Sequence, residues 1–372
     1  MSEAVVVNSF LIVRVFLVGG ILLILPRINR KGLLFGVYVG EEFTDGGERR
    51  GVLRGWDRGC VMVMAISLLV GLTISVTGHP VGGNLTGTAV LLLAGLGLYL
   101  RTYSRVRQLA PSGVERQADK ATATLQVQEP RGEPFAKLTL LICLVAALAT
   151  VIYALLSYRG MPTPMPTLLS LIGGADGWTD RPFLTVMYLP SWNLVVGPLF
   201  ALLGIMVATA KRSLRDGPGG RSAEAQDAFR ALMATVFSGI ALSYSALLTL
   251  LSVQVIRVGL SQARWIGAGF LVLLGAALAF MLGSLILIMR RYGQGGALLE
   301  RGPEGGALTG GLADNAHWVW GLFYVNRDDP SLMLESRFGI GYTLNYGNRN
   351  AVIFVVAAGS LIIHLTVLGF FL

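Results

Sequence analysis

The chain has 372 residues, of which 53% are hydrophobic and 14% are charged. Soluble globular domains carry about 25% charged residues, and a mean hydropathy of +0.65 leaves too few polar side chains to cover a surface exposed to water. A soluble enzyme is therefore excluded. Several apolar runs are long enough to cross a hydrocarbon core of about 30 Å, so we predict a polytopic membrane protein whose first partner is the lipid bilayer.

Eight apolar segments are predicted to be membrane-spanning helices, because backbone polar groups in lipid must hydrogen-bond within their own segment. They cover residues 4–25, 60–77, 82–100, 138–157, 184–210, 231–256, 265–289 and 351–372. The short alternating segments of a membrane barrel are absent. The expected fold class is an all-α polytopic membrane protein with about eight transmembrane helices and a small β-rich cytoplasmic loop module.

The orientation follows from the basic residues between these segments. Residues 26–59, 101–137, 211–230 and 290–350 hold 7, 7, 5 and 6 of the 30 Lys and Arg residues, whereas the alternate connections hold four. The positive-inside rule then places the basic segments in the cytoplasm and both termini outside. We expect a multi-pass protein of the bacterial cytoplasmic membrane, whose net charge of +9 suits anionic headgroups rather than nucleic acid.

Four regions are predicted along the chain. Residues 1–290 form a seven-helix membrane region, and 351–372 form the final helix. Between them, residues 291–311 are rich in glycine, which is typical of a flexible linker. Residues 312–350 form the β-rich module, in which aromatic runs surround the turn signal of residues 326–331.

The most specific pattern on the outer side lies in the predicted extracytoplasmic loop 158–183 and the start of the next helix. It runs over residues 162–193, with Pro166, Gly173 and the Asp-Gly-Trp sequence at 176–178. It resembles the bacterial membrane family called domain of unknown function 1648, found in relatives of the SdpI immunity protein. Leu168 and Ser170 stand where that family has histidine and asparagine. The resemblance implies immunity to a membrane-active peptide, with signalling to a cytoplasmic regulator.

The C-terminal module resembles a second family, domain of unknown function 5808. The matching residues are Trp320, Gly321, Phe323, Tyr324, Asn326, Asp328, Asp329, Pro330, 337–341 and Asn345. Residues 27–43 also resemble the corresponding loop of such proteins. This family has no assigned activity, so the resemblance implies a fold and no chemistry.

Five residues are candidate ligand contacts: Asp176, Trp178, Asp180, Arg181 and Asn193. The first four lie at the predicted outer mouth of the fifth span, where they form either a recognition lip or ordinary turns with an interfacial tryptophan. Asn193 lies between Pro190 and Pro198, which either break the helix and open a polar site or simply kink it.

Five residues of the module are candidate contacts for a cytoplasmic regulatory protein: Trp320, Asn326, Asp328, Asp329 and Arg337. A calcium loop is disfavoured at residues 326–331, because the glycine and the distal glutamate of an EF-hand are missing.

Two ionisable residues within the spans have either a functional or a structural role. Arg14 is the one formally charged residue in the predicted spans, and it is explained equally well by a carbonyl partner, by snorkelling or by a substrate contact. His364 is interpreted as either a packing residue or a proton carrier.

Hydrolase, metalloprotease and phosphate-loop motifs are absent, so we expect no enzyme, no cofactor and no metal. The first functional hypothesis is a protein that senses, or gives immunity to, a membrane-active peptide or envelope stress. The alternative is a permease or lipid-handling protein that uses a proline-broken fifth helix.

Overall fold

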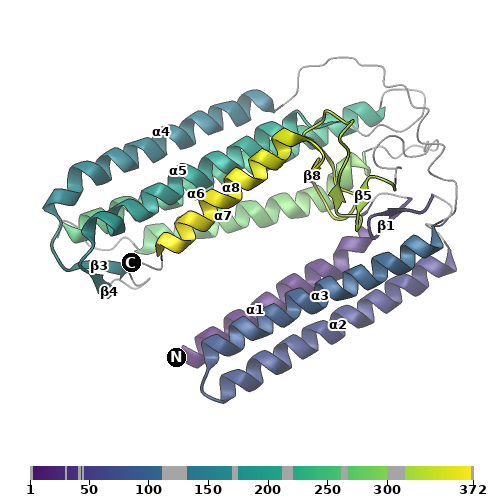
Figure 1. The fold of residues 1–372 in the computed structure, drawn as a ribbon, viewed down its shortest axis with the longest axis horizontal. Helices are drawn as coiled ribbons and strands as arrows, with labels where there is room; N and C mark the ends of the chain where they lie inside the picture. Colours follow the sequence, from purple (N-terminus) through teal and green to yellow (C-terminus); the bar gives the residue numbers. More distant parts are fainter. Residues whose placement is uncertain are drawn as a thin grey trace.

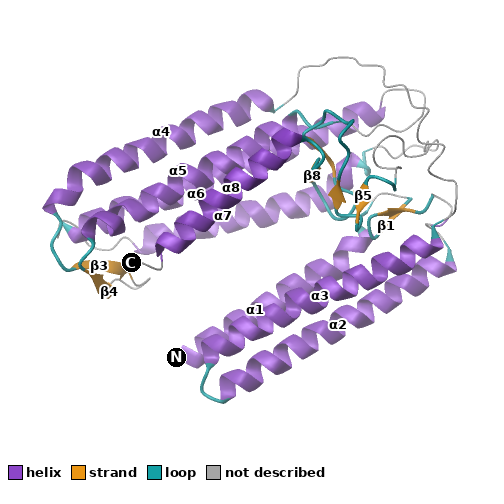
Figure 2. Cartoon of the chain, in the orientation of Figure 1, coloured by secondary structure: helices purple, strands orange, loops and turns teal. Residues whose placement is uncertain are grey.

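The computed structural model describes residues 3–29, 32–40, 43, 46–110, 132–169, 175–211, 221–260, 267–299 and 315–369. Helices make up most of this part of the chain, and the strands are confined to short hairpins at the two ends of the helices (Figure 2). The helices form two groups that lie side by side, with the hairpins of the C-terminal module at one end of both (Figure 1).

The first group contains α1 (Glu3–Ile24), α2 (Gly47–Val76) and α3 (Pro80–Leu109). Small residues bring α2 and α3 into backbone contact: a Cβ atom on Gly83 would lie 2.3 Å from the carbonyl oxygen of Gly71. One turn away, the Ser67 hydroxyl donates to the Gly87 carbonyl at 2.6 Å. Close approach of small residues and hydrogen bonds replace the hydrophobic effect as the force between helices in lipid.

The second group contains α4 (Glu133–Ser157), α5 (Pro182–Ala208), α6 (Arg221–Gly259), α7 (Gly267–Leu287) and α8 (Arg349–Gly369). Helices α4, α5 and α6 pack against one another, α7 packs mainly on α6, and α8 packs mainly on α5. Extensive helix packing among the described residues occurs within each group, and the two groups are joined chiefly by the loops and hairpins at one end (Figure 1).

The prediction of eight long apolar helices is confirmed, since eight helices of the described chain are long and apolar enough to cross a membrane. Several helices extend beyond the predicted apolar spans. Helix α2 begins at Gly47 rather than at residue 60, and α6 begins at Arg221 rather than at residue 231. Polar, basic residues continue these helices beyond the apolar run, because a helix that leaves hydrocarbon is still free to continue in water.

Of the two alternatives for the fifth span, a helix broken by its prolines and a helix only kinked by them, the structure contradicts the first. Helix α5 runs unbroken from Pro182 to Ala208, with Pro190 and Pro198 inside it. Each proline removes one backbone hydrogen bond, and neighbouring helices in a membrane bundle tolerate that loss. The kinked-helix alternative is the one consistent with this continuity.

The described residues also form four two-stranded antiparallel hairpins. The first pairs β1 (Leu33–Leu34) with β2 (Val37–Tyr38), and the second pairs β3 (Met165–Leu169) with β4 (Ala175–Thr179). In the C-terminal module, β5 (Trp318–Val319) pairs with β6 (Phe323–Tyr324), and β7 (Met333–Glu335) pairs with β8 (Tyr342–Leu344). We call residues 315–348 the bridging module.

The two ends of the helices differ in what they carry. The bridging module and the β1–β2 hairpin lie together at one end, whereas the β3–β4 hairpin and the two ends of the chain lie at the other (Figure 1). This arrangement agrees with the predicted partition of the connections between two sides of a membrane.

The beginning of the glycine-rich segment is packed rather than open. Beyond α7, a π turn (Ile288–Tyr292) leads to a short 3-10 turn (Gln294–Gly296) whose three residues are buried. A Cβ atom on Gly295 would lie 2.1 Å from the Glu335 carboxylate, and one on Gly296 would lie 2.6 Å from the Ala225 carbonyl oxygen. These glycines allow close approach, so the flexible linker expected from residue 291 does not begin there; residues 300–314 lie outside the described chain.

The first helix group meets the bridging module through two glycines. Gly36 and Gly321 both have positive φ angles, and a Cβ atom on Gly36 would lie 2.4 Å from the Gly321 carbonyl oxygen.

We expect Gly36→Ala to cost both backbone strain and steric overlap, whereas Gly40→Ala, at a similarly positive φ in open space, costs the strain alone. The difference in unfolding free energy should be about 1–3 kcal/mol, measured by denaturant unfolding of the full chain in detergent. Equal losses in both variants would contradict this contact.

Candidate functional site

The four candidate contacts at the predicted outer mouth follow one another along the β3–β4 hairpin and the start of α5. The register places Trp178 opposite Pro166, and Asp176 lies within β4. The side chains of residues 166–178 lie outside the described part of the structure. Asp180 and Arg181 are exposed, and the Arg181 carbonyl accepts hydrogen bonds from Thr185 at the start of α5.

Asn193 lies apart from these four residues. It is fully buried on α5, about three turns, or about 18 Å, beyond Arg181. Its Nδ2 atom donates to the Thr249 hydroxyl on α6 at 2.9 Å, while its Oδ1 atom has no hydrogen-bond partner among the described residues. The candidate ligand contacts therefore divide into residues 176–181, which we call the outer lip after its predicted side and of which Asp180 and Arg181 are exposed, and a separate buried amide.

Asp329 joins the bridging module to the second helix group. Its Oδ2 atom accepts from Lys211 Nζ at 2.6 Å and from the Tyr324 hydroxyl at 3.1 Å. Its Oδ1 atom accepts from the backbone and the hydroxyl of Ser331 at 3.0 and 2.7 Å. Lys211 also donates its backbone N–H to the Met333 carbonyl at 2.9 Å. The chain just beyond α5 is thus fastened to the Asp329 turn by an ion pair and to β7 by a backbone bond.

The electrostatics of Asp329 favour its charged form. Burial by itself raises the pKa of this carboxyl group, but hydrogen bonds from Lys211 and Ser331, with the charge of Lys211, outweigh burial and hold the pKa below its ordinary value. A carboxylate whose pKa is depressed by folding stabilises the folded state above its unfolded pKa of about 3.9. That contribution is lost as the pH falls through the folded pKa.

Asn326 belongs to the turn that supports Asp329. Its backbone N–H donates to Asn345 Oδ1 at 3.0 Å, and its own Oδ1 accepts from the Asp328 backbone at 2.9 Å. Asn345 is fully buried, and its Nδ2 atom reaches the carbonyls of Asn326 and Asp329 at 2.8 and 2.9 Å. The residues with the turn signal therefore form a loop that is held by hydrogen bonds from side chains to the backbone and is closed by Asn345.

Arg337 fastens the module to the first helix group. Its side chain is buried, with the guanidinium carbon 4.9 Å from the Trp318 ring centre. Its Nη1 atom donates to Asn315 Oδ1 at 2.7 Å and to the Gly36 carbonyl at 3.3 Å. Asn315 in turn exchanges two hydrogen bonds with the Tyr38 backbone, at 3.0 and 3.1 Å.

Aromatic packing reinforces this second connection. The Phe35 ring lies 4.9 Å from Trp56 of α2 and 5.8 Å from Phe338 of the module. The Tyr99 hydroxyl of α3 donates to the Trp320 carbonyl at 2.9 Å. Phe35 has a positive φ of 46°, a conformation that a bulky residue adopts only where surrounding contacts require it.

The five candidate partner contacts thus divide by exposure. Asp329 and Arg337 are buried and hold the module together, and Asn326 is partly buried in the turn. Trp320 and Asp328 are exposed, the tryptophan by 51%. A regulatory protein could therefore touch the last two directly, whereas the others position the surface that it would meet.

Arg14 has partners that the sequence did not indicate. Its Nη1 atom donates to Asn84 Oδ1 at 3.0 Å and to the Thr88 hydroxyl at 2.6 Å, both on α3. Asn84 also donates to the Val7 carbonyl of α1 at 2.9 Å. The sequence feature that could have indicated these partners was Asn84, a lone asparagine in an apolar run. His364, in contrast, is exposed on α8.

Asp329 and its neighbour Asp328 provide a matched pair of substitutions. We expect Asp329→Asn to lower the unfolding free energy by about 2–3 kcal/mol, because the variant loses the charge that receives the Lys211 and Ser331 hydrogen bonds in a buried setting. Asp328→Asn, at an exposed side chain, should change it by less than about 0.5 kcal/mol. Thermal unfolding of both purified variants in detergent measures the difference, and equal stabilities would contradict the assigned role of Asp329.

Comparison with known protein families supports the C-terminal module. The model of the Family of unknown function (DUF5808) matches residues 327–349, which cover the Asp329 turn, β7, β8, Arg337 and the start of α8. No curated protein and no solved structure matches the chain. The match supports the resemblance predicted for the module and brings no activity with it.

Proposed function

We propose that this protein is a non-enzymatic membrane sensor, which couples contact with a membrane-active peptide outside the cell to a regulatory protein in the cytoplasm. The observation that carries the proposal is the course of α5. This helix begins three residues after the β3–β4 hairpin and ends three residues before Lys211, which is bonded to the bridging module. It is a continuous rod of about 40 Å between the two ends of the molecule.

The proposed orientation rests on charge. The basic connections lie at the end that carries the bridging module, and the positive-inside rule places that end in the cytoplasm. The β3–β4 hairpin and both chain ends would then face the outside of a bacterial cytoplasmic membrane. Immunity to a peptide also draws on the resemblance of residues 162–193 to the family found in SdpI relatives.

Transmission would use the two fastenings of the bridging module. A tilt or shift of α5, caused by a ligand at the outer lip, would move Lys211 and with it Asp329 and β7. The opposite side of the module is held against the first helix group by Arg337 and Phe35. The module would therefore turn between a moving and a fixed support, which would change how Trp320 and Asp328 are presented to the regulator.

The outer lip is tested by removing its chemistry. In a bacterial strain that lacks the endogenous gene, we expect the double variant Asp176→Asn/Trp178→Ala to lose the protection that the wild-type chain gives against a membrane-active peptide. The loss should equal that of the empty strain, because both the carboxylate and the aromatic anchor are absent. Minimum inhibitory concentrations over a panel of cationic and neutral peptides are the measurement.

The control variant is His79→Ala. His79 is exposed in the turn between α2 and α3, which is also predicted to face outside, and its side chain does not cap α3. Membrane abundance of each variant is measured in the same cells. Full protection by the double variant, or equal loss with His79→Ala, would contradict recognition by the lip. A separate experiment tests the coupling to the cytoplasm. A photo-crosslinker at position 320 that captures one particular protein in peptide-treated cells, and does not capture it in untreated cells, would support this coupling.

A second function has one specific observation in its favour. Asn193 is fully buried with its Oδ1 atom unpartnered among the described residues, which suits a polar site for a small solute or a lipid headgroup within the second helix group. This permease or lipid-handling proposal is compatible with the continuity of α5, because the proposed site needs the buried amide of Asn193 and does not need a break in the helix.

We expect Asn193→Leu to abolish this second activity while leaving the bridging module folded. Ser191→Ala on the same helix is the control, because that hydroxyl bonds to the Met187 carbonyl of its own turn. Proteoliposomes with a fluorescent phospholipid measure lipid movement between leaflets. Equal rates for the wild type and Asn193→Leu would contradict a transport role for Asn193.

A further inference from the structure

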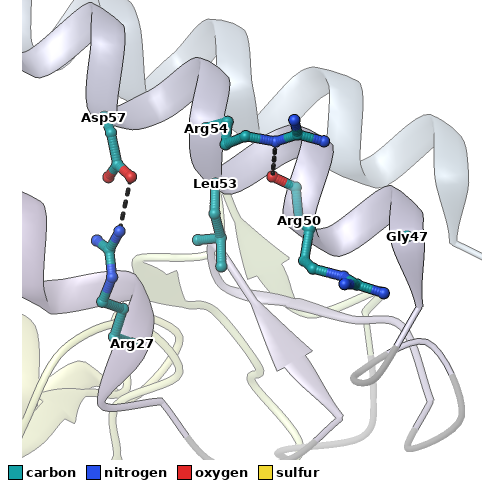
Figure 3. Close-up of a pocket in the computed structure, with 6 residues that line it drawn as sticks. All are labelled: Arg27, Gly47, Arg50, Leu53, Arg54 and Asp57. Atoms are coloured by element: carbon teal, nitrogen blue, oxygen red, sulfur yellow. Dashed lines mark hydrogen bonds and ion pairs between the residues drawn. The ribbon is translucent and has the colours of Figure 1, made fainter.

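A basic pocket lies beside the cytoplasmic ends predicted for α1 and α2, at a distance in sequence from every candidate contact discussed above. Its volume is about 490 Å³. Figure 3 shows Arg27 facing α2 across the pocket from the short 3-10 turn (Leu25–Arg27) that follows α1. The lining residues are Arg27, Gly47, Arg50, Leu53, Arg54 and Asp57.

One of the three guanidinium groups is neutralised and two are not. Arg27 forms an ion pair with Asp57 at 2.6 Å and also donates to the Leu23 carbonyl. Arg54 uses only its Nε atom, which donates to the Arg50 carbonyl at 3.3 Å. The Arg50 guanidinium makes no hydrogen bond or ion pair with the described residues. Within the described part of the chain, the pocket therefore presents two guanidinium groups that form no ion pair and whose terminal nitrogens make no hydrogen bond (Figure 3).

The depth of the pocket follows from the exposed residues of α2. Arg50, Arg54 and Arg58 are exposed, and within one turn beyond them Val61 and Met62 are 59% and 63% exposed. That change marks the boundary at which the helix surface becomes suited to hydrocarbon. Arg54 lies seven residues before Val61, about 10 Å along the helix, and the headgroup layer adds about 5–7 Å on each side of the hydrocarbon core. Arg54 thus lies at the water-facing edge of the headgroup layer, within reach of a lipid headgroup because the arginine side chain is long.

We propose that this pocket binds the phosphate of an anionic membrane lipid, a function that does not depend on the proposed sensing. The planar forks of Arg50 and Arg54 suit two phosphate oxygens each. The first turn of the 30-residue helix α2 adds backbone N–H groups, and no side chain caps them. Leu53 supplies an apolar wall next to the charged groups, as a lipid glycerol backbone requires. Free inorganic phosphate shares the headgroup chemistry, but the apolar wall at Leu53 favours the lipid.

The test compares two double variants of the full chain in detergent. Arg50→Gln/Arg54→Gln removes the two free charges of the pocket, and Arg101→Gln/Arg105→Gln removes two exposed charges of α3 at the same end. Native mass spectrometry counts the lipids retained during titration with phosphatidylglycerol, with phosphatidylcholine as the neutral comparison. We expect affinity for phosphatidylglycerol to fall at least about tenfold in the pocket variant and less than about twofold in the α3 variant.

Three outcomes would overturn the proposal. Unchanged affinity in the pocket variant would exclude the pocket, and equal loss in both variants would show attraction to net charge alone. Inorganic phosphate that displaces phosphatidylglycerol from the wild type at equal concentration would assign the pocket to a soluble phosphate compound. Thermal unfolding of each variant, measured in the same detergent, separates lost binding from lost folding.

Discussion

Hydrocarbon offers a membrane helix no hydrogen bonds and no hydrophobic drive toward its neighbours, and the arrangement of this molecule follows from that constraint. Helices can associate only where backbones approach closely or where polar groups meet. Gly71 and Gly83 satisfy the first condition between α2 and α3, and Arg14 with Asn84 satisfies the second between α1 and α3. Between the two helix groups neither kind of contact is extensive in the described chain, so their connection is made at the aqueous end.

The bridging module supplies that connection because water outside the bilayer restores the chemistry that lipid excludes. On one side of the module, a buried arginine, an asparagine and a cluster of aromatic rings contact the first group. On the other side, an ion pair and a backbone hydrogen bond reach Lys211 beyond α5. The module is thus held on both sides by contacts that involve few of its residues, mostly within 315–345.

The sequence predicted the membrane layout well because an apolar run is a direct consequence of the solvent that it meets. The ends of the helices were less predictable: α2 and α6 continue through basic residues that carry no apolar signal. The sequence also left open whether α5 continues through Pro190 and Pro198, because proline costs one hydrogen bond and tertiary packing decides whether the helix survives it.

The candidate residues illustrate the same limit. The turn around Asp329 and the strands of the module could be predicted from local chemistry. Which of Asp328 and Asp329 points inward could not, since the answer depends on Lys211, 118 positions away. Arg337 likewise owes its burial to Gly36, which is 301 positions away. The Arg50 and Arg54 pocket was hidden in the overall basic charge, because charge counts do not reveal which guanidinium groups lack a partner.

The two fastenings of the bridging module differ in a way that bears on how it would move. The contact with the first group is made of backbone approach at Gly36 and of stacked rings, whose tight packing resists small displacements. The contact with the second group combines the ion pair and the backbone bond of Lys211 with an apolar cluster that contains Met333 of β7, Val207 of α5 and Phe229 of α6. A displacement of α5 would therefore reach β7 through both the Lys211 bonds and this cluster, with the first helix group as the support. In the proposed sensor, the basic pocket lined by Arg50 and Arg54 would hold the first helix group in place by binding a membrane lipid.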